Sequence, residues 1–401
     1  MQTEKSYRWT VLIASCLGPF VFGLSMQVLP PVLPMLIRDF GLTHAEAGLS
    51  MGLFAAPMIF LSIPAGMLAD RHGPRLVGLI AFAVTIAGDL LVASSPTFPV
   101  LLAGRAFTGL GAITLVLISS QFVSQWFHGK ELGLAVGIWN TAFPLAAILS
   151  LTTMGSIGQA MGGWRGPVLI AAAVALASMV AFGLLASPAP LAQEHVRPQG
   201  SIRSQIFLAG PSIWFVGAAW LFFNASTVAF FSFAPDYFQS AGYSVTDAGL
   251  LSSMTLWGVF LLAPLVGLLL DRGMRPKLLI VLGSVGYALS LAVLPVNPSW
   301  AVPILLFVTL ANQLTVVSIF ALPPSLLTPN LLGLGYGILA TCMNIGTTLG
   351  PLAVGLARDL TGAYTVSFWV MAFLALLISV SVAPMFISHK NAAVAPTATR
   401  E

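Results

Sequence analysis

Twelve apolar runs recur along this 401-residue chain, and they constrain its fold more than any other feature. Each run reaches the length of about 20 residues that a helix needs to cross the hydrocarbon core of a bilayer. Only 7% of the residues are charged, whereas a water-soluble domain carries roughly 25%. The sequence therefore predicts an all-α integral membrane protein with twelve transmembrane helices.

Helices are favoured over a barrel because the runs are continuous, whereas the strands of a lipid-facing barrel alternate apolar and polar residues. The abundant glycine and proline do not argue against helices, since both are commoner in membrane helices than in soluble ones. The predicted spans are 9–30, 46–69, 76–94, 98–126, 132–158, 166–187, 211–235, 247–270, 277–296, 300–324, 333–357 and 364–388.

Basic residues are distributed unevenly among the predicted loops. If the N-terminus is cytoplasmic, 12 of the 16 lysines and arginines lie on the cytoplasmic side, while Arg38, Arg165 and Arg358 lie outside. Arg105 falls inside a span. Because cytoplasmic loops are enriched in lysine and arginine, both termini are predicted to be cytoplasmic. The net charge of +4 reflects this bias and does not indicate a nucleic-acid partner.

The chain reads as a tandem duplication of a six-helix unit. Ala47-Gly48-Leu49 recurs as Ala248-Gly249-Leu250 at an offset of 201, and Gly133-Leu134 recurs as Gly333-Leu334 at an offset of 200. The longest polar stretch lies between the two copies. Since six is even, both units enter the membrane from the same side, so the bundles are parallel. The predicted domains are an N-terminal bundle (1–187), a cytoplasmic linker (188–210) and a C-terminal bundle (211–401).

A short segment between the second and third spans carries a family signature. The residues Gly66-Met67-Leu68-Ala69-Asp70-Arg71-His72-Gly73-Pro74-Arg75 match the loop motif of the major facilitator superfamily, and 267–277 is a weaker copy. With the twelve spans and the repeat, the chain resembles this superfamily over almost its whole length. The resemblance implies two parallel six-helix bundles around a central cavity, which rock to give alternating access.

The resemblance also implies a conformational latch in these loops, which ties one bundle to the other in one state and releases it in the next. Asp70 is suited to this role because a carboxylate accepts hydrogen bonds from free amides at a neighbouring helix N-terminus. A plain basic cytoplasmic loop is the alternative. The predicted latch residues are Gly66, Asp70, Arg71, Arg75, Asp271 and Arg272.

Asp89 and Arg105 are the two formal charges that fall well inside the spans. A charge at the bilayer centre costs at least ~2.5 kcal/mol, so neither should face lipid unpaired. They lie near the outer ends of antiparallel neighbouring spans, and we predict that the two side chains meet as a charge pair or coupling pair. The resemblance implies that Arg105 binds an anionic group of the substrate or biases the protonation of a nearby acid. A permanent structural ion pair is the alternative.

Amide and aromatic side chains mark the rest of the predicted substrate pathway. Amides are costly in lipid, so they face protein, water or substrate. In the family, spans one, four, seven and ten line the cavity, and span seven here is rich in aromatic rings. Interhelical hydrogen bonds and plain packing are the alternative uses. The predicted substrate-binding residues beside Arg105 are Gln27, Asn140, Trp220, Phe223, Asn224, Asn312, Gln313 and Asn344.

Motifs of enzymes are missing from the sequence. It contains no zinc-protease motif, no nucleophile elbow and no phosphate-cradling loop, and the five histidines lie in or beside predicted loops. We therefore expect no enzymatic activity, no cofactor and no metal ion. Without a nucleotide-binding loop, the energy for transport must come from a solute or ion gradient, unless the process is facilitated diffusion.

The sequence predicts a secondary transporter in the inner membrane of a bacterium. A single basic residue among amides and rings favours a small organic solute, with a monocarboxylate-like anion preferred and proton symport as the expected coupling. The expected partners are this solute, protons and the lipid bilayer, with no nucleic acid and a monomeric chain. Export of amphipathic drug-like compounds is the first alternative, and a non-transporting receptor on the same fold is the second.

Overall fold

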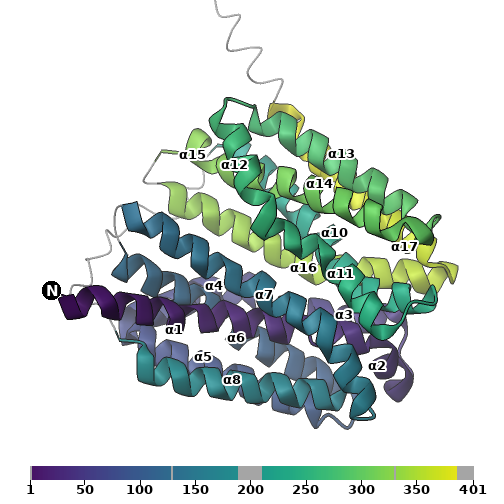
Figure 1. Cartoon of the computed structure of the whole chain (residues 1–401), viewed down its shortest axis with the longest axis horizontal. Coiled ribbons are helices and arrows are strands. Elements are labelled where there is room, and N and C mark those ends of the chain that lie inside the picture. The colour runs from purple at the N-terminus through teal and green to yellow at the C-terminus, as the bar shows by residue number, and fades with distance from the viewer. Residues whose placement is uncertain (1, 128–129, 188–209, 329–330, 386–401) are drawn as a thin grey trace, which may run out of the picture.

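The computed structural model describes residues 2–127, 130–187, 210–328 and 331–385, and only the backbone at 2–6, 62–63, 66, 70 and 130. All regular secondary structure in this part of the chain is helical (Figure 1). The N-terminal group comprises α1 (Gln2–Gln27), η1 (Pro30–Val32), α2 (Leu33–Phe40), α3 (His44–Gly52), α4 (Met58–His72), α5 (Pro74–Ala93), α6 (Phe98–Trp126), α7 (Lys130–Ala160) and α8 (Arg165–Leu185). The C-terminal group comprises α10 (Ser212–Ser240), α11 (Val245–Leu261), α12 (Ala263–Asp271), α13 (Pro276–Val293), η2 (Pro298–Trp300), α14 (Ala301–Ala321), α15 (Pro323–Leu326), α16 (Leu332–Thr361) and α17 (Tyr364–Val382).

The helices match the predicted spans with two exceptions. Within the described residues, ten helices are long and apolar enough to cross a membrane, and α11 with α12 forms an eleventh span bent by 41°. The predicted span 46–69 is not one helix: α3 ends at Gly52 and α4 begins at Met58. Counting α3 with α4 gives the twelve spans that the sequence predicts.

The break between α3 and α4 has a local cause. Pro57 lacks an amide hydrogen and disfavours a helical residue before it, which favours an interruption at residues 53–57 even though other helices here, such as α7 at Pro144, continue through a proline. The amides there instead form short turn bonds, such as Ala55 N–H to the Gly52 carbonyl at 3.0 Å. An apolar run alone does not reveal such a turn, which is why the sequence predicts a continuous helix.

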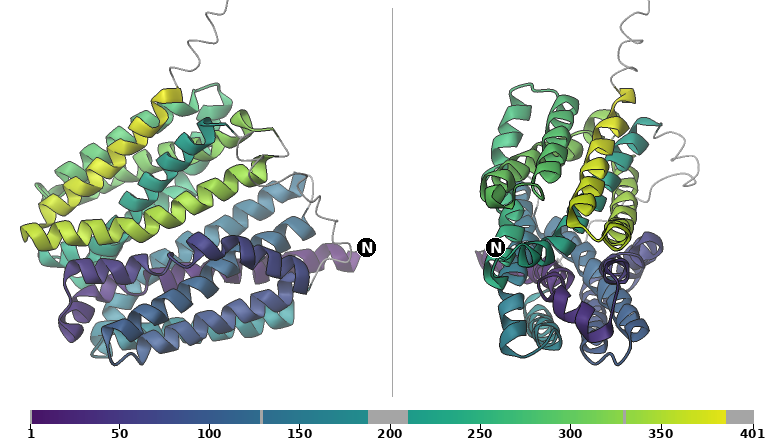
Figure 2. Two further views of the ribbon diagram at one scale, coloured as in Figure 1. Left: turned by 180° about the vertical axis from the view of Figure 1, so that it is seen from behind. Right: turned by 90° about the vertical axis from the view of Figure 1, so that its right-hand side faces the viewer.

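The two groups lie one above the other, and they share much of their internal packing (Figure 2). In the N-terminal group α5 packs between α6 and α8, and in the C-terminal group α13 packs between α14 and α17. Helix α1 packs on α7, as α10 packs on α16, but the groups differ in their other contacts: α1 then packs mainly on α6, whereas α10 packs on α17 and barely touches α14. The predicted linker, 188–210, lies outside the described residues except for Gly210, so this domain boundary stays a prediction.

Matching helix caps support the duplication. Thr43 caps α3, because its hydroxyl accepts from the Glu46 amide at 3.2 Å and its own amide donates to the Glu46 carboxylate at 2.8 Å. Ser244 caps α11 at the equivalent position, where its hydroxyl accepts from the Asp247 amide at 3.1 Å. The two caps are 201 positions apart, the offset of the sequence repeat.

The two groups meet mainly at one end of the molecule, which we call the closed end; it carries the turns at 41–43, 94–97, 161–164, 241–244, 294–297 and 362–363. There α3 packs on α16 and α11 packs on α7 (Figure 1). Glycine makes both contacts possible: a side chain on Gly48 would strike the backbone of Pro351, and one on Gly249 would strike the backbone of Leu151.

The opposite end, which carries the start of α7 and the start of α16, is the open end. A Cβ added at Gly133 or Gly137 on α7 would meet nothing within 4 Å, and the same holds for Gly333 and Gly337 on α16. The space beside these repeated glycines is therefore open in this conformation, whereas the space beside Gly48 and Gly249 is occupied by backbone of the opposite group. Around the repeated glycines, α7 and α16 are thus less closely packed than at the closed end.

Gly111 tests the packing inside the N-terminal group. A Cβ there would lie 2.5 Å from the Ala81 carbonyl oxygen on α5, so we expect Gly111→Ala to lower the melting temperature. Overpacking of this kind typically costs about 1–3 kcal/mol. Thermal unfolding of the purified protein in detergent measures the effect.

Gly133→Ala is the matched control. The position is open, so alanine there should keep the melting temperature or raise it slightly through its higher helix propensity. Equal melting temperatures for the two variants would contradict the packing described for α5 and α6.

Candidate functional site

Arg105 lies on α6 with 1% of its surface exposed. Its Nη1 donates to the Ser25 carbonyl of α1 at 2.8 Å, and its Nε donates to the Ser50 carbonyl of α3 at 3.2 Å. The guanidinium also lies 4.7 Å from the ring centroid of Phe54. Three segments of the N-terminal group therefore hold the charge in place.

The interruption between α3 and α4 brings Phe54 to this position. The Phe54 backbone sits against Gly109 of α6, where any side chain would collide with the Phe54 carbonyl. Gly109 lies one helical turn after Arg105, on the same face of α6. The spacing of Arg105 and Gly109 thus has a packing reason: the glycine admits the turn that carries the aromatic ring.

The third nitrogen of the Arg105 guanidinium, Nη2, is not used in these contacts. This atom is enclosed and has no hydrogen-bond partner among the described residues. A buried charged donor without a partner is expensive, and such groups in membrane proteins mark sites of function. The geometry thus leaves this nitrogen available to an acceptor that the protein does not itself provide.

Asp89 lies on α5, with 1% of its surface exposed. The Ser25 hydroxyl donates to Oδ2 at 3.0 Å, and the Thr108 hydroxyl donates to Oδ1 at 3.0 Å. Asp89 and Arg105 do not come within ion-pair distance of each other in the described structure. The predicted direct charge pair is therefore wrong. Ser25 stands between the two charges, with its hydroxyl on Asp89 and its carbonyl on Arg105.

The predicted amides lie in different surroundings. Gln27, Asn312, Gln313 and Asn344 are all at least 95% buried. Asn312 Oδ1 is enclosed and has no partner among the described residues, as is also true of Ser318 Oγ on the same helix. Burial places these side chains inside the protein, and their role in substrate binding stays a prediction.

The two remaining predicted amides, Asn224 and Asn140, make no described hydrogen bond to another helix. Asn224 is half-buried, and its Nδ2 donates to the Trp220 carbonyl one turn earlier on α10, at 2.7 Å. Asn140 is exposed on α7. Neither amide lies in a described contact with the site around Arg105.

The predicted aromatic wall of α10 is mostly used in packing. Trp220 and Phe223 stack on each other with centroids 5.2 Å apart and an angle of 6° between the planes. Phe320 of α14 contacts Trp220 edge-on at 5.0 Å. The facing surfaces of Trp220 and Phe223 cover each other, so only their outer surfaces remain for a ligand.

Two residues of the predicted latch, Gly66 and Asp70, are described by their backbone alone, so the contacts of the Asp70 carboxylate lie outside the described part of the chain. Arg71, Asp271 and Arg272 are exposed near the open end. Arg75 donates from Nη2 to the Gly183 carbonyl of α8 at 2.6 Å, a contact within its own group. The latch stays a prediction for another conformation.

Sequence reasoning missed two sets of polar residues. Thr108, three residues after Arg105, shares its helix face, so helical spacing was a usable signal. Ser25 gave none, because a serine in an apolar helix usually bonds to its own backbone, as Ser15 does. The second set joins His44 to the C-terminal group at the closed end, through residues more than 190 positions away.

Ser25→Ala tests the bridge between the two charges. The variant removes the hydroxyl that donates to Asp89 and keeps the carbonyl that accepts from Arg105, so we expect a lower melting temperature. Hydrogen bonds to charged groups contribute about 1.5–3 kcal/mol. Ser15→Ala on the same helix is the control, because the Ser15 hydroxyl bonds only to the Val11 carbonyl. Equal loss in both variants would argue against the bridge.

Comparison with known proteins places this chain in a family. The family model described as Major Facilitator Superfamily matches residues 15–333 and 226–401. Facilitated glucose transporter member 10 of solute carrier family 2, from Mus musculus, is 26% identical over 299 residues, which is 69% of this chain and 56% of that protein. The chain thus spans little more than half the length of that relative.

A relative of similar length and a solved structure extend the comparison. The probable sulfoacetate transporter SauU of Cupriavidus necator is 21% identical over 397 residues, 92% of each chain. The crystal structure of a bacterial homologue of the human lysosomal transporter Spinster, inward-facing and unoccupied, superposes with a TM-score of 0.77 at 18% identity, covering 94% of this chain and 97% of that one. The protein, a multi-pass membrane chain with the fold of these transporters, belongs to the Major Facilitator Superfamily.

Proposed function

We propose that this protein is a proton-coupled secondary transporter of a small organic anion, with a monocarboxylate-like or sulfonate-like head group. The two helix groups rock around a site next to Arg105, which is enclosed in the present conformation. The protein works in a bacterial inner membrane as a monomer. Its termini are cytoplasmic and the closed end faces outside, because the basic loops around Arg71 and Arg272 lie at the open end.

The unpartnered Nη2 of Arg105 carries this proposal. Anionic oxygens of a carboxylate or sulfonate are the partners that a guanidinium binds best, through short charge-assisted hydrogen bonds. A neutral solute could offer only an uncharged acceptor, which binds a guanidinium less strongly than a carboxylate or sulfonate does. The name of the relative SauU, a probable sulfoacetate transporter, agrees with an organic anion.

Asp89 supplies the coupling in this proposal. Its carboxylate shares Ser25 with Arg105, so a substrate anion that binds at Arg105 adds negative charge close to Asp89. That charge favours the uptake of a proton by Asp89, and by linkage a bound proton favours the anion equally. Anion and proton therefore cross together, and the net charge of the buried site changes little.

Arg105→Lys tests anion recognition. A lysine keeps the positive charge and loses the planar fork, so we expect the affinity for the substrate anion to fall at least about tenfold, or roughly 1.4 kcal/mol. Ligands are first found by thermal shift with a panel of monocarboxylates, sulfonates and amphipathic cations at two pH values. Binding to the purified variant then gives the affinity.

Arg38→Lys is the control, because Arg38 is exposed at the closed end and outside the proposed site. Unchanged anion affinity in Arg105→Lys would refute recognition by the guanidinium.

Asp89→Asn tests the coupling. An amide cannot take up the proton, so we expect proteoliposomes with this variant to lose accumulation driven by a pH gradient. Exchange of labelled for unlabelled substrate across the membrane should persist, since it needs no net proton movement. Accumulation by Asp89→Asn in response to the gradient would show that the proton travels elsewhere. Glu131→Gln, an exposed acid on α7, is the control.

The stacked rings of α10 favour one other function, the export of amphipathic compounds. In that case amphipathic cations would raise the melting temperature, Arg105→Lys would leave their binding unchanged, and substitution of Trp220 would weaken it. A receptor without transport would show ligand-dependent accessibility of its helices and no flux in proteoliposomes.

A further inference from the structure

Two helix contacts between the groups, which we call the first and the second seam, shut the closed end. The sequence repeat relates the two seams. In the first seam, α3 packs on α16 and the His44 backbone fills the space beside Gly355; in the second seam, α11 packs on α7 and the Val245 side chain fills the space beside Gly155. His44 and Val245 are 201 positions apart, and Gly155 and Gly355 are 200 apart. The two seams are thus copies of one packing arrangement.

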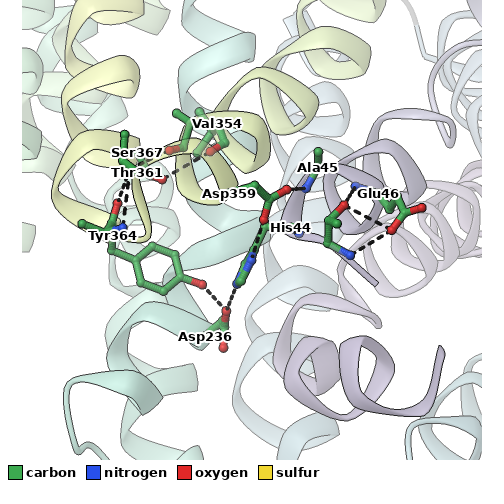
Figure 3. A network of polar contacts seen from close by, with 12 residues as sticks. His44, Ala45, Glu46, Asp236, Val354, Asp359, Thr361, Tyr364 and Ser367 are labelled. Carbon is green, nitrogen blue, oxygen red and sulfur yellow. Dashed lines mark hydrogen bonds and ion pairs between the residues drawn. The ribbon is translucent and has the colours of Figure 1, made fainter. Parts of the chain in front are cut away.

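The first seam carries a charged cluster across the two helix groups (Figure 3). His44 Nδ1 lies 3.1 Å from Asp359 Oδ1 on α16, and His44 Nε2 lies 3.6 Å from Asp236 Oδ2 on α10. Asp359 also accepts from the backbone amides of His44 and Ala45, at 2.9 and 2.7 Å. Asp359 therefore binds the N-terminus of α3 from the opposite group, where the helix dipole favours an anion.

The contacts of His44 call for a protonated cluster. Neutral histidine and two carboxylates together lack one of the protons that these contacts need. A neutral imidazole has one N–H, and here both ring nitrogens face carboxylate oxygens. Asp236 Oδ2 already accepts from the Tyr364 hydroxyl. With neutral His44, one nitrogen lone pair would face a carboxylate oxygen without a hydrogen between them, so the added proton stabilises the contact wherever it sits in the cluster.

The surrounding groups leave the cluster net negative without that proton. The charged and titratable groups around His44 are Glu46 on α3, Asp236 on α10, Asp359 and Arg358 on α16, and Tyr364 on α17. Arg358 lies over the Tyr364 ring at 4.6 Å and opposes protonation of His44. The carboxylates of Asp236 and Asp359 outweigh it and raise the pKa of His44 above its ordinary value of 6.5.

No charged contact crosses the second seam within the described residues, since Asp247 there only caps its own helix. At the place of His44 it has Val245, and at the places of Asp236 and Asp359 it has Met35 and Gln159. Its polar contact is a hydroxyl pair, Ser156 with Thr246 at 3.1 Å. Packing of this seam therefore needs no ionisable group, and the cluster of the first seam adds something that closure itself does not require.

We propose that His44, Asp236 and Asp359 form a proton-binding site between the two helix groups, and that protonation of this site holds the closed end shut. When the groups separate, His44 leaves both carboxylates and returns to the affinity of an exposed histidine. The protonated site thus belongs to the closed conformation, and protons on that side of the membrane oppose opening.

The sign of the pH effect follows from the raised proton affinity. Stabilisation of the closed end is complete below the ordinary histidine pKa of 6.5 and is lost as the pH rises through the higher value of the closed form. The proton enters and leaves from the same side, so it regulates opening and is not carried across. The inference does not depend on the proposed substrate or on Asp89.

Distances between spin labels at Ser94 and Val296 test the proposal. Both residues are exposed at the closed end, one in each group, and the labels are placed in a Cys16→Ala, Cys342→Ala background of the full chain. As the pH falls from 8.5 to 6 without substrate, we expect the ratio of closed to open molecules to rise, by at most about tenfold per pH unit for one proton.

Two variants at the site test the proposal independently of each other. His44→Gln should lose the rise in the closed population, because its amide does not titrate. Asp236→Asn should remain closed at pH 8.5, because its amide can donate to the neutral Nε2 of His44, and this outcome holds even if the glutamine variant folds poorly. An unchanged pH profile in His44→Gln, or opening of Asp236→Asn at high pH, would overturn the proposal.

Thr246→Val, in the second seam, is the matched control. It removes the hydroxyl contact with Ser156 and should change the closed fraction at every pH while keeping its pH dependence. Asp89 is present in all these proteins, so any contribution from its titration is common to them. Loss of the pH dependence in Thr246→Val would also overturn the proposal, since the effect would then not belong to the charged seam.

Discussion

Close helix contact at glycine is the interaction on which both the scaffold and the site of this protein depend. In a membrane, helices gain little from hiding apolar surface from each other, so association rests on tight packing and on interhelical hydrogen bonds. Gly48 and Gly249 let the two helix groups meet at the closed end, and Gly109 admits the turn that brings Phe54 beneath Arg105. The same device therefore sets the conformation of the whole molecule and the shape of its charged site.

The repeat supplies a symmetric scaffold, and the chemistry is placed on one copy only. Both seams of the closed end share their glycines and helix caps, yet only the first seam carries the cluster around His44. Arg105 likewise has no charged counterpart in α14, where Phe307 lies at a similar offset and is exposed. Because packing does not require these charges, each of them has to be explained by function or by an individual structural contact.

The sequence predicts the scaffold well, because span length and repeat offset are local properties of the chain. It also identifies Arg105 and Asp89 as the charges that need an explanation. It does not reveal the turn at residues 53–57, since the apolar run continues through Pro57, and it wrongly joins the two charges directly instead of through Ser25. The cluster at the closed end could not be found from sequence at all: His44, Asp236 and Asp359 each read as a loop or helix-end residue until the fold brings them together.

The two sets of ionisable residues differ in where a proton can go, and this difference decides what each set can do. Asp89 and Arg105 are enclosed in the N-terminal group, so a proton bound there can be exposed to one side and then to the other as the groups rock. The cluster at His44 is divided between the two groups, so opening the closed end takes the site apart and returns its proton to the side it came from. A site inside one group can couple a proton to transport, whereas a site shared across a seam can only set how readily the seam opens. With both proposals taken together, protons would drive the cycle from the centre and oppose opening at the closed end.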